Sequence, residues 1–266
     1  MNGMEKNKMI DTGYLYAKNN DRIFINTCLG CRGGCSYCYL PTLGYDNTGK
    51  DLLVKDASEI IKDIEESHFN INENTLITFG CFSECWDEQN KPQTIRLISH
   101  FLQKGNQVQL ATKKQIKIEE CKQFQQLIKY MGQLVIFVSS ATISQWDKIE
   151  KNTEMPEKRF KTFEISKTLD IPTVLYMKPI LKGITIKDIE LYEDVIKKFA
   201  VKDVVVGSIF KEEKTDETVH FSDNNKLFYN PVPDELEIKR RLLPLCNVYS
   251  RSSEVMKKYR EKELER

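Results

Sequence analysis

Four of the eight cysteines in this 266-residue chain fall within eleven residues, at positions 28, 31, 35 and 38. The last three, Cys31, Cys35 and Cys38, have the spacing C-x3-C-x2-C. Three thiolates can hold three irons of a [4Fe-4S] cluster and leave the fourth iron open to an external ligand, which makes that iron a reaction site. Glycines at 30, 33 and 34 lie between these cysteines and allow the chain to wrap closely around a cluster.

Cys28 offers a fourth thiol, so other kinds of metal site are also possible. Four cysteines could close a tetrahedral zinc site or supply all four ligands of a ferredoxin-like cluster. Zinc ribbons usually separate two C-x2-C pairs by a longer insert, and the ferredoxin run places its last cysteine before a proline, whereas Tyr39 follows Cys38 here. The spacing therefore favours an open cluster on three cysteines with a structural Cys28, and leaves a closed metal site and unliganded thiols as alternatives.

Strands and helices must position this loop, and their pattern alternates along the chain. Strands are predicted at 22–27, 75–79, 108–111, 134–138, 173–177 and 204–206, and the first runs directly into the cysteine loop. Helices are predicted at 54–67, from about 95 to Gly105, at 116–131, from Pro156 to about 169, and at 186–199, with a polar helical tail at 252–266. Alternating strands and helices indicate an α/β fold with a parallel sheet and right-handed crossovers. Periodicity alone does not separate a partial barrel from a flat doubly wound sheet.

Composition narrows the class of protein. Forty Lys and Arg against 39 Asp and Glu leave a net charge of +1, so no global field draws the chain to nucleic acid or to anionic lipid. The chain contains no window of 18 apolar residues, and its polar start is unlike a secretory signal. We therefore expect a cytoplasmic protein with reduced thiols and no membrane partner.

The cysteine loop resembles that of the radical S-adenosylmethionine superfamily, which has C-x3-C-x2-C with an aromatic residue, here Tyr37, before the last cysteine. The run GlyCysSerTyrCysTyrLeu at 34–40 is similar to the spore photoproduct lyase branch. The resemblance implies a partial (β/α)6 TIM-like barrel over 22–210, after an N-terminal segment at 1–21 and before a C-terminal extension at 211–266 packed on the barrel. It also implies two cofactors, a [4Fe-4S] cluster and S-adenosylmethionine.

Later segments of the chain are similar to that branch too. Cys81-Phe82-Ser83-Glu84 follows the second predicted strand and resembles a motif in which the cysteine returns a hydrogen atom to the product radical and the serine lies near the methionine part of the cofactor. Thr112-Lys113 resembles a pair whose lysine approaches the cofactor carboxylate, and Ser139 or Ser140 resembles a serine near the cofactor ribose. Cys81 is more often a small buried residue than a hydrogen donor, and Lys113 is as typical of a solvated basic residue as of a cofactor contact.

The favoured function is an enzyme that reductively cleaves S-adenosylmethionine to a 5′-deoxyadenosyl radical and abstracts hydrogen from an organic substrate. An external one-electron donor such as flavodoxin or ferredoxin would be its partner. The family analogy suggests a nucleic acid or nucleotide as substrate, and a peptide or small metabolite agrees equally well with the near-zero charge. The alternative is a non-catalytic electron carrier or a zinc-stabilised binding module that uses all four clustered cysteines.

Overall fold

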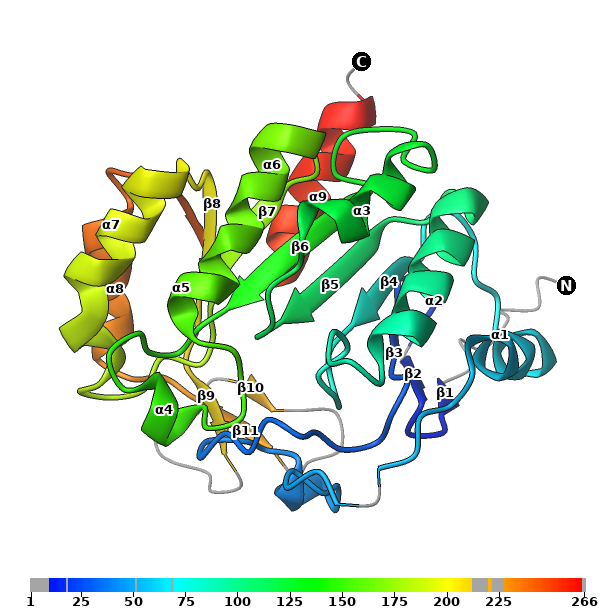
Figure 1. The fold of residues 1–266 in the computed structure, drawn as a ribbon, viewed down its shortest axis with the longest axis horizontal. Coiled ribbons are helices and arrows are strands. Elements are labelled where there is room, and N and C mark those ends of the chain that lie inside the picture. Colours follow the sequence, from blue (N-terminus) through cyan, green and yellow to red (C-terminus); the bar gives the residue numbers. More distant parts are fainter. Residues whose placement is uncertain are drawn as a thin grey trace, which may run out of the picture.

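A nine-stranded open sheet is the centre of the computed structural model, which describes residues 10–17, 19–50, 52–67, 69–211, 220–221 and 227–264 (Figure 1). Six consecutive strands pair in parallel: β3 (Arg22–Ile25), β4 (Leu76–Phe79), β5 (Val108–Thr112), β6 (Leu134–Ser139), β7 (Thr173–Met177) and β8 (Asp203–Val206). All six predicted strands are therefore confirmed, together with the α/β class.

Both edges of the sheet carry strands that were not predicted from the sequence. The antiparallel strands β1 (Ile10–Asp11) and β2 (Leu15–Ala17) pair onto β3, and β12 (Asn247–Tyr249) pairs parallel to β8. Within the described residues β1 and β12 do not meet, so the sheet is a partial barrel and not a closed one. The division of the chain at residues 21 and 210 stays a prediction.

The helices alternate with the strands as predicted, but several are shorter. They are α1 (Ala57–Glu66), α2 (Lys91–Lys104), α3 (Ile118–Gln125), α5 (Pro156–Arg159), α6 (Glu164–Leu169) and α7 (Ile189–Phe199), with 3-10 turns η2 (Phe160–Phe163) and η3 (Thr185–Asp188). Gly105 ends α2 in the left-handed conformation, φ +93°, as its position predicted. The helix predicted at 116–131 stops at Gln125, although Leu127 and Ile128 still pack on the core from a turn, which is why the apolar spacing continues.

Other elements had no sequence signal that we recognised. The short helices are η1 (Pro41–Leu43), α4 (Trp146–Ile149) and α8 (Asp234–Leu242). Strands β9 (Ile209–Lys211), β10 (His220–Phe221) and β11 (Phe228–Asn230) form a separate antiparallel sheet. No helix in the described part of the chain combines the length and apolar character that crossing a bilayer requires.

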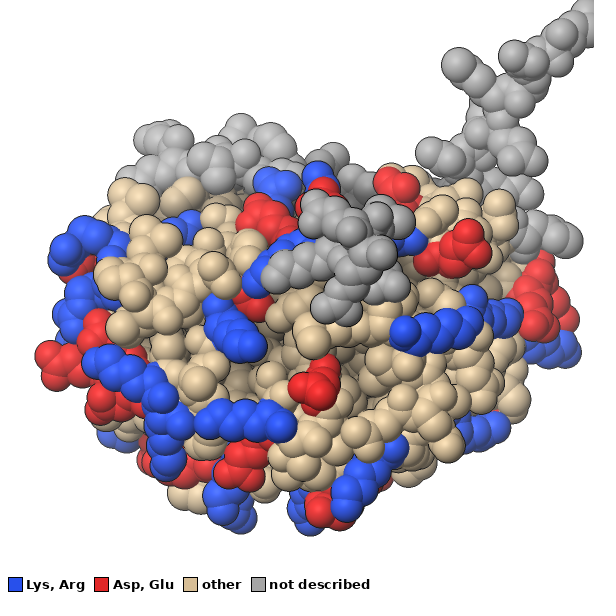
Figure 2. All heavy atoms as spheres, turned by 90° about the horizontal axis from the view of Figure 1, so that it is seen from above, with Lys and Arg blue, Asp and Glu red and all other residues tan. Residues whose placement is uncertain are grey.

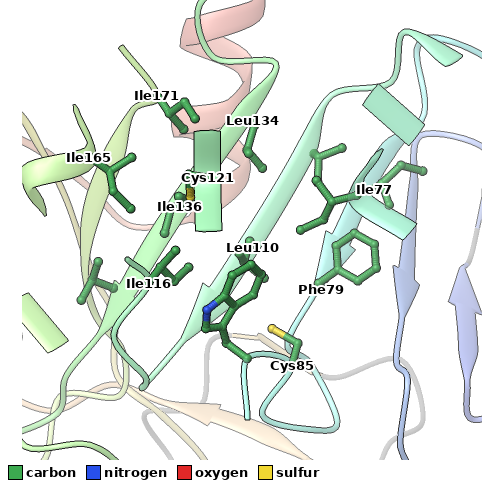
Figure 3. Close-up of a cluster of buried hydrophobic side chains, with 14 of the residues drawn as sticks. Ile77, Phe79, Cys85, Leu110, Ile116, Cys121, Leu134, Ile136, Ile165 and Ile171 are labelled. Atoms are coloured by element: carbon green, nitrogen blue, oxygen red, sulfur yellow. The ribbon is translucent and has the colours of Figure 1, made fainter. Parts of the chain in front are cut away.

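The two faces of the main sheet bury different side chains. Residues such as Ile77, Leu110 and Ile136 point toward the helices and form the larger core, which also takes in Cys85 and Cys121 (Figure 3). The alternate residues point to the concave face, because successive side chains of a strand point to opposite faces. There, a smaller core forms between Leu76, Val135, Phe137, Val174 and Val205 and the last helix.

That helix, α9 (Ser252–Leu264), has the predicted helical conformation, and its apolar face packs against the sheet. Met256 is 1% exposed, and its carbonyl oxygen accepts a hydrogen bond of 2.9 Å from the Gln107 side chain. Gly132 has φ +88°, and a Cβ atom there would lie 2.4 Å from Tyr259 Cβ, so the helix approaches the backbone closely. The helix thus fills the end of the partial barrel where the parallel strands begin.

Figure 2 looks onto the molecule from above the view of Figure 1. On the face that it shows, Lys and Arg are interspersed with Asp and Glu.

Because α9 completes the smaller core, truncating its buried face should destabilise the whole fold. We expect Met256→Ala to lower the free energy of unfolding by about 2–5 kcal/mol, the usual cost of removing a buried methionine side chain. Urea denaturation followed by circular dichroism measures this change. Lys257→Ala on the solvent side of the same helix, where the side chain is 75% exposed, is the control and should change little; equal effects of the two substitutions would contradict the docking.

Candidate functional site

A cavity of about 1160 Å³ opens at the carboxyl ends of the parallel strands, where α/β proteins generally bind ligands. Its lining contains all but one of the predicted site residues: Cys31, Cys35, Tyr37, Cys38, Cys81, Ser83, Lys113 and Ser139. Ser140 is outside this lining, and so is Cys28. Residues more than 100 positions apart in the sequence therefore face one space.

The cysteine loop has the close packing expected around a bulky inorganic group. A Cβ atom at Gly33 would lie 3.3 Å from Cys31 Sγ and 3.8 Å from Cys35 Sγ, so glycine keeps this space clear. The Gly33 amide also donates a hydrogen bond of 3.2 Å to Cys31 Sγ, the type of contact that tunes cluster sulfurs. Burial, and then the charge of Glu84, raise the pKa of Cys31 to about 12. A bound metal must therefore displace the thiol protons.

Cys28 lies outside the cavity lining that the other three cysteines share. It is fully buried and forms an isolated bridge with Val54, and burial raises its pKa to about 11. Among the described residues, no three Cys, His, Asp or Glu side chains come together closely enough to hold a single metal ion. This finding does not separate the three-cysteine cluster from a four-cysteine site, and both stay predictions.

Lys113 places a positive charge beside the cysteine loop. Its ammonium nitrogen lies 5.7 Å from the centre of the Tyr37 ring. Burial lowers the pKa of Lys113, but the charges of Cys35, Glu150 and Glu84 outweigh burial and raise the pKa overall. In the described structure no carboxylate lies within 4 Å of this ammonium, so it is charged without a close ion-pair partner.

Glu84, the acid of the motif Cys81-Phe82-Ser83-Glu84, forms a hydrogen bond with the backbone of Lys113. One Glu84 carboxylate oxygen accepts a hydrogen bond of 2.8 Å from the Lys113 amide. The other accepts from the Thr112 hydroxyl and, at 3.1 Å, from the Trp86 amide. Glu84 therefore connects the loop after β4 to the end of β5. It positions Lys113 through the backbone and does not itself need to contact a ligand.

The candidate serines differ in what their hydroxyl groups contact. Ser83 is 7% exposed, and its buried hydroxyl has no hydrogen-bond partner among the described residues, which is unusual for a buried polar atom. Ser139 lines the cavity at the end of β6. Ser140 points the other way, fully buried, with its hydroxyl 3.1 Å from the Tyr192 hydroxyl. Of the two serines proposed for one role, only Ser139 faces the cavity.

Cys81 faces the cavity as a protonated thiol. Its sulfur lies 3.7 Å from the Tyr39 hydroxyl, which donates a hydrogen bond of 2.6 Å to the Cys81 carbonyl oxygen. Burial raises the pKa of Cys81, so the S–H bond is intact at neutral pH. Cys85, four residues later, instead points into the core, where its sulfur lies 3.3 Å from the Ala111 carbonyl oxygen (Figure 3).

A buried ion pair beneath the cysteine loop was missed by the sequence analysis. Arg159 and Glu150 are both fully buried and 2.8 Å apart. Glu150 also accepts a hydrogen bond from the Tyr37 hydroxyl, and Arg159 donates to the Ser139 carbonyl oxygen at 2.6 Å. These residues come from separate segments with no shared motif, so no spacing in the sequence could have connected them.

The comparisons with known proteins concern the fold. No family model matches the sequence, and neither does any curated protein. Among solved structures, a mutant of spore photoproduct lyase is similar over 93% of this chain and 79% of that one, with a TM-score of 0.62 and 15% identity. Another mutant of that lyase, with bound AdoMet and dinucleoside spore photoproduct, has a TM-score of 0.60 and 15% identity over 91% of this chain and 78% of that one.

A second kind of enzyme has a similar fold. The radical S-adenosylmethionine methyltransferase TsrM from Kitasatospora setae, with cobalamin and [4Fe-4S] cluster bound, matches 85% of this chain and 52% of its own, with a TM-score of 0.54 and 11% identity. The chain therefore has the fold of these two enzymes, and the fold that the resemblance implied is confirmed.

The buried ion pair between Arg159 and Glu150 should contribute strongly to the stability of the fold. We expect Arg159→Met to lower the free energy of unfolding by about 3–5 kcal/mol, because the substitution leaves the Glu150 carboxylate buried without its partner. Chemical denaturation measures the loss. Replacing both residues, as Arg159→Met with Glu150→Gln, should recover part of it, since the uncompensated charge is then gone; a double variant no more stable than the single one would contradict this interpretation.

Proposed function

We propose that this chain is a radical S-adenosylmethionine enzyme. The observation that supports it most directly is the grouping of Cys31, Cys35 and Cys38 with Ser83 and Lys113 around one cavity, in a fold shared with spore photoproduct lyase and TsrM. When bound, a [4Fe-4S] cluster supplies the electron that cleaves S-adenosylmethionine to methionine and a 5′-deoxyadenosyl radical. An external one-electron donor, such as flavodoxin or ferredoxin, would be the partner that supplies this electron.

Residues of this chain fit both cofactors. The three thiolates of the cysteine loop would hold the cluster, with space kept open by Gly33. Lys113 would pair with the carboxylate of S-adenosylmethionine, and burial strengthens such charge pairing relative to a surface. The unpartnered Ser83 hydroxyl would bond to the methionine part of that cofactor, and Ser139 would approach its ribose.

Cys81 is proposed to act after the substrate radical has reacted. Its S–H bond would break homolytically, the hydrogen atom would pass to the product carbon, and the unpaired electron would remain on sulfur. A buried, protonated thiol suits this role, because a thiolate has no hydrogen atom to give. The Tyr39 hydroxyl donates a hydrogen bond to the Cys81 carbonyl oxygen and lies 3.7 Å from the thiol sulfur.

The cavity is large enough for more than the cofactor. Ligand pockets usually have volumes of about 300–1,000 Å³, and this one reaches about 1160 Å³. An organic substrate can therefore bind beside S-adenosylmethionine. A nucleotide is one candidate, since a lyase with this fold binds a dinucleoside spore photoproduct, and a peptide or small metabolite is another. The competing function is an electron carrier or zinc-stabilised module that also uses Cys28.

Single cysteine substitutions separate these functions. After anaerobic reconstitution, Cys31→Ala, Cys35→Ala and Cys38→Ala should each lose the cluster absorbance and all 5′-deoxyadenosine formation, because each removes one iron ligand. Cys28→Ala is the matched control, and it should keep both. Iron analysis and chromatographic detection of 5′-deoxyadenosine are the measurements. Loss of the cluster with Cys28→Ala, or bound zinc in place of iron, would instead support the competing function.

A further substitution tests the hydrogen donor. Cys81→Ala should leave 5′-deoxyadenosine formation in the reduced enzyme unchanged, because the thiol is not a cluster ligand, but it should change the products formed from the substrate radical. Cys85→Ala, whose sulfur is in the core, is the control and should leave the product distribution as it is. Product analysis by mass spectrometry decides, and identical products from Cys81→Ala and wild type would remove Cys81 from the reaction.

A further inference from the structure

Two cations in the cavity have no role in the proposed cofactor binding. Arg22, on β3, points to the concave face and lines the cavity. Its Nε donates a hydrogen bond of 2.8 Å to the Thr78 hydroxyl, and Nη2 donates one of 3.2 Å to the Gln109 side-chain oxygen. The guanidinium also lies 4.4 Å from the centre of the Phe24 ring. These contacts orient Arg22 but are all uncharged.

Arg22 is therefore a half-buried positive charge that has no counter-ion among the described residues. No carboxylate of the described residues lies within 4 Å of it, and burial lowers its pKa. The groups whose charge would act on Arg22 are the Tyr176 phenol and the Cys81 thiol, and burial raises the pKa of both, so both are neutral at neutral pH. Uncompensated buried charge is costly, and proteins rarely keep it without a ligand or partner.

Lys178, which follows β7, adds a second cation. Its ammonium nitrogen lies 5.5 Å from the Phe210 ring centre and 5.4 Å from that of Tyr229. The aliphatic stem packs against Gly207, where a Cβ atom would lie 3.0 Å from Lys178 Cδ. The acid that acts most strongly on this lysine, Glu235, already forms an ion pair of 2.6 Å with Lys239.

Lys178 and Arg22 line the same cavity. Burial is the main cause that lowers the pKa of Lys178 to about 8, and the charges of Arg251 and Arg22 lower it further. Arg251 also lines the cavity, and its side chain is exposed. The cavity lining also contains six acidic residues, of which Asp87 and Glu120 form ion pairs with Arg32 and Lys91. The potential beside Arg22 and Lys178 still favours an anion, because neither has a carboxylate within 4 Å among the described residues.

Arg22 and Lys113 come from different parts of the cavity wall. Lys113 follows β5 and lies beside Tyr37 of the cysteine loop. Arg22 lies on β3, where it contacts Thr78 and Gln109. The Lys113 side would hold the proposed cofactor, which leaves the space beside Arg22 and Lys178 for a second molecule.

We propose that Arg22 and Lys178 form an oxyanion subsite, and that the substrate is an organic anion whose phosphate or carboxylate group binds there. This inference rests on the proposed function only in identifying the bound molecule as the substrate. The guanidinium would offer its remaining N–H donors to two oxygens of the acid group, and the ammonium would add a point charge. The aromatic rings of Phe24, Tyr176 and Phe210 would contact an apolar part of the same molecule.

Binding of simple anions tests the subsite without turnover. The full chain with its reconstituted cluster, unreduced, is titrated calorimetrically at about pH 7, where Lys178 is mostly protonated. The probes are phenyl phosphate, benzoate and the neutral benzyl alcohol. Binding of phenyl phosphate, of benzoate or of both, with no binding of benzyl alcohol, supports the proposal and shows which acid group is preferred. Equal binding of all three, or of none, overturns it.

Variants then locate the bound anion. Arg22→Gln and Lys178→Met should each raise the Kd of the bound probe at least about tenfold, since each removes a desolvated charge contact. Arg96→Gln on the exposed face of α2 makes the same charge change outside the cavity and should leave the Kd unchanged. Thermal unfolding and circular dichroism check that each variant folds. Loss of binding in Lys113→Met but not in the two subsite variants would place the anion at the cofactor end and overturn the proposal.

The proposed subsite and the proposed function can each fail without the other. Cleavage of S-adenosylmethionine is measured separately, as 5′-deoxyadenosine from the reduced enzyme. Probe binding that depends on Arg22 without any such cleavage would refute the enzyme and keep the subsite. Cleavage by a protein that binds no anionic probe would keep the enzyme and refute the subsite.

Discussion

The ion pair between Arg159 and Glu150 joins three segments that form the site. Glu150 accepts from Tyr37 in the cysteine loop, and Arg159 donates to the carbonyl oxygen of Ser139 at the end of β6. Arg159 also donates to the hydroxyl of Thr153 at 2.8 Å. Because neither charge is exposed, each is tolerated only in the presence of the other. The loop that carries the cysteines and the strand end that carries Ser139 are thereby held in one arrangement before any ligand arrives.

The alternation of side chains along each strand determines what this arrangement faces. One face of the sheet is aliphatic and packs under the helices, and α9 fills the beginning of the other face. Polar residues on that second face, such as Arg22, Thr78 and Gln109, therefore lie between the α9 core and the open end. The α9 core therefore closes one end of the cavity, and polar side chains line it. Bound molecules would meet hydrogen-bond donors in fixed positions.

Sequence patterns predicted most of the scaffold, because buried parallel strands are short apolar runs. Cys81 and Lys113 were indicated by the resemblance, and both line one cavity, while their roles stay predictions. Both follow a parallel strand, where side chains meet at one edge of the sheet, and this rule could also have indicated Lys178. Glu150 and Arg159 could not be found, since their pairing depends on loops whose path no local pattern specifies. The resemblance implied that the C-terminal extension packs on the barrel, but the polar composition of α9 did not reveal its buried face, which includes Val255, Met256 and Tyr259.

The docking of α9 also has a kinetic consequence. Its contacts reach far back along the chain, as with the Met256 carbonyl and Gln107, which are 149 residues apart. Such high contact order slows folding, and the helix has no surface to dock on until β4 to β8 have assembled. During that interval Val135, Phe137 and Val174 would be uncovered in a partly folded intermediate. Aggregation from this intermediate would then compete with the final docking step, so the yield of native protein should fall as its concentration during refolding rises.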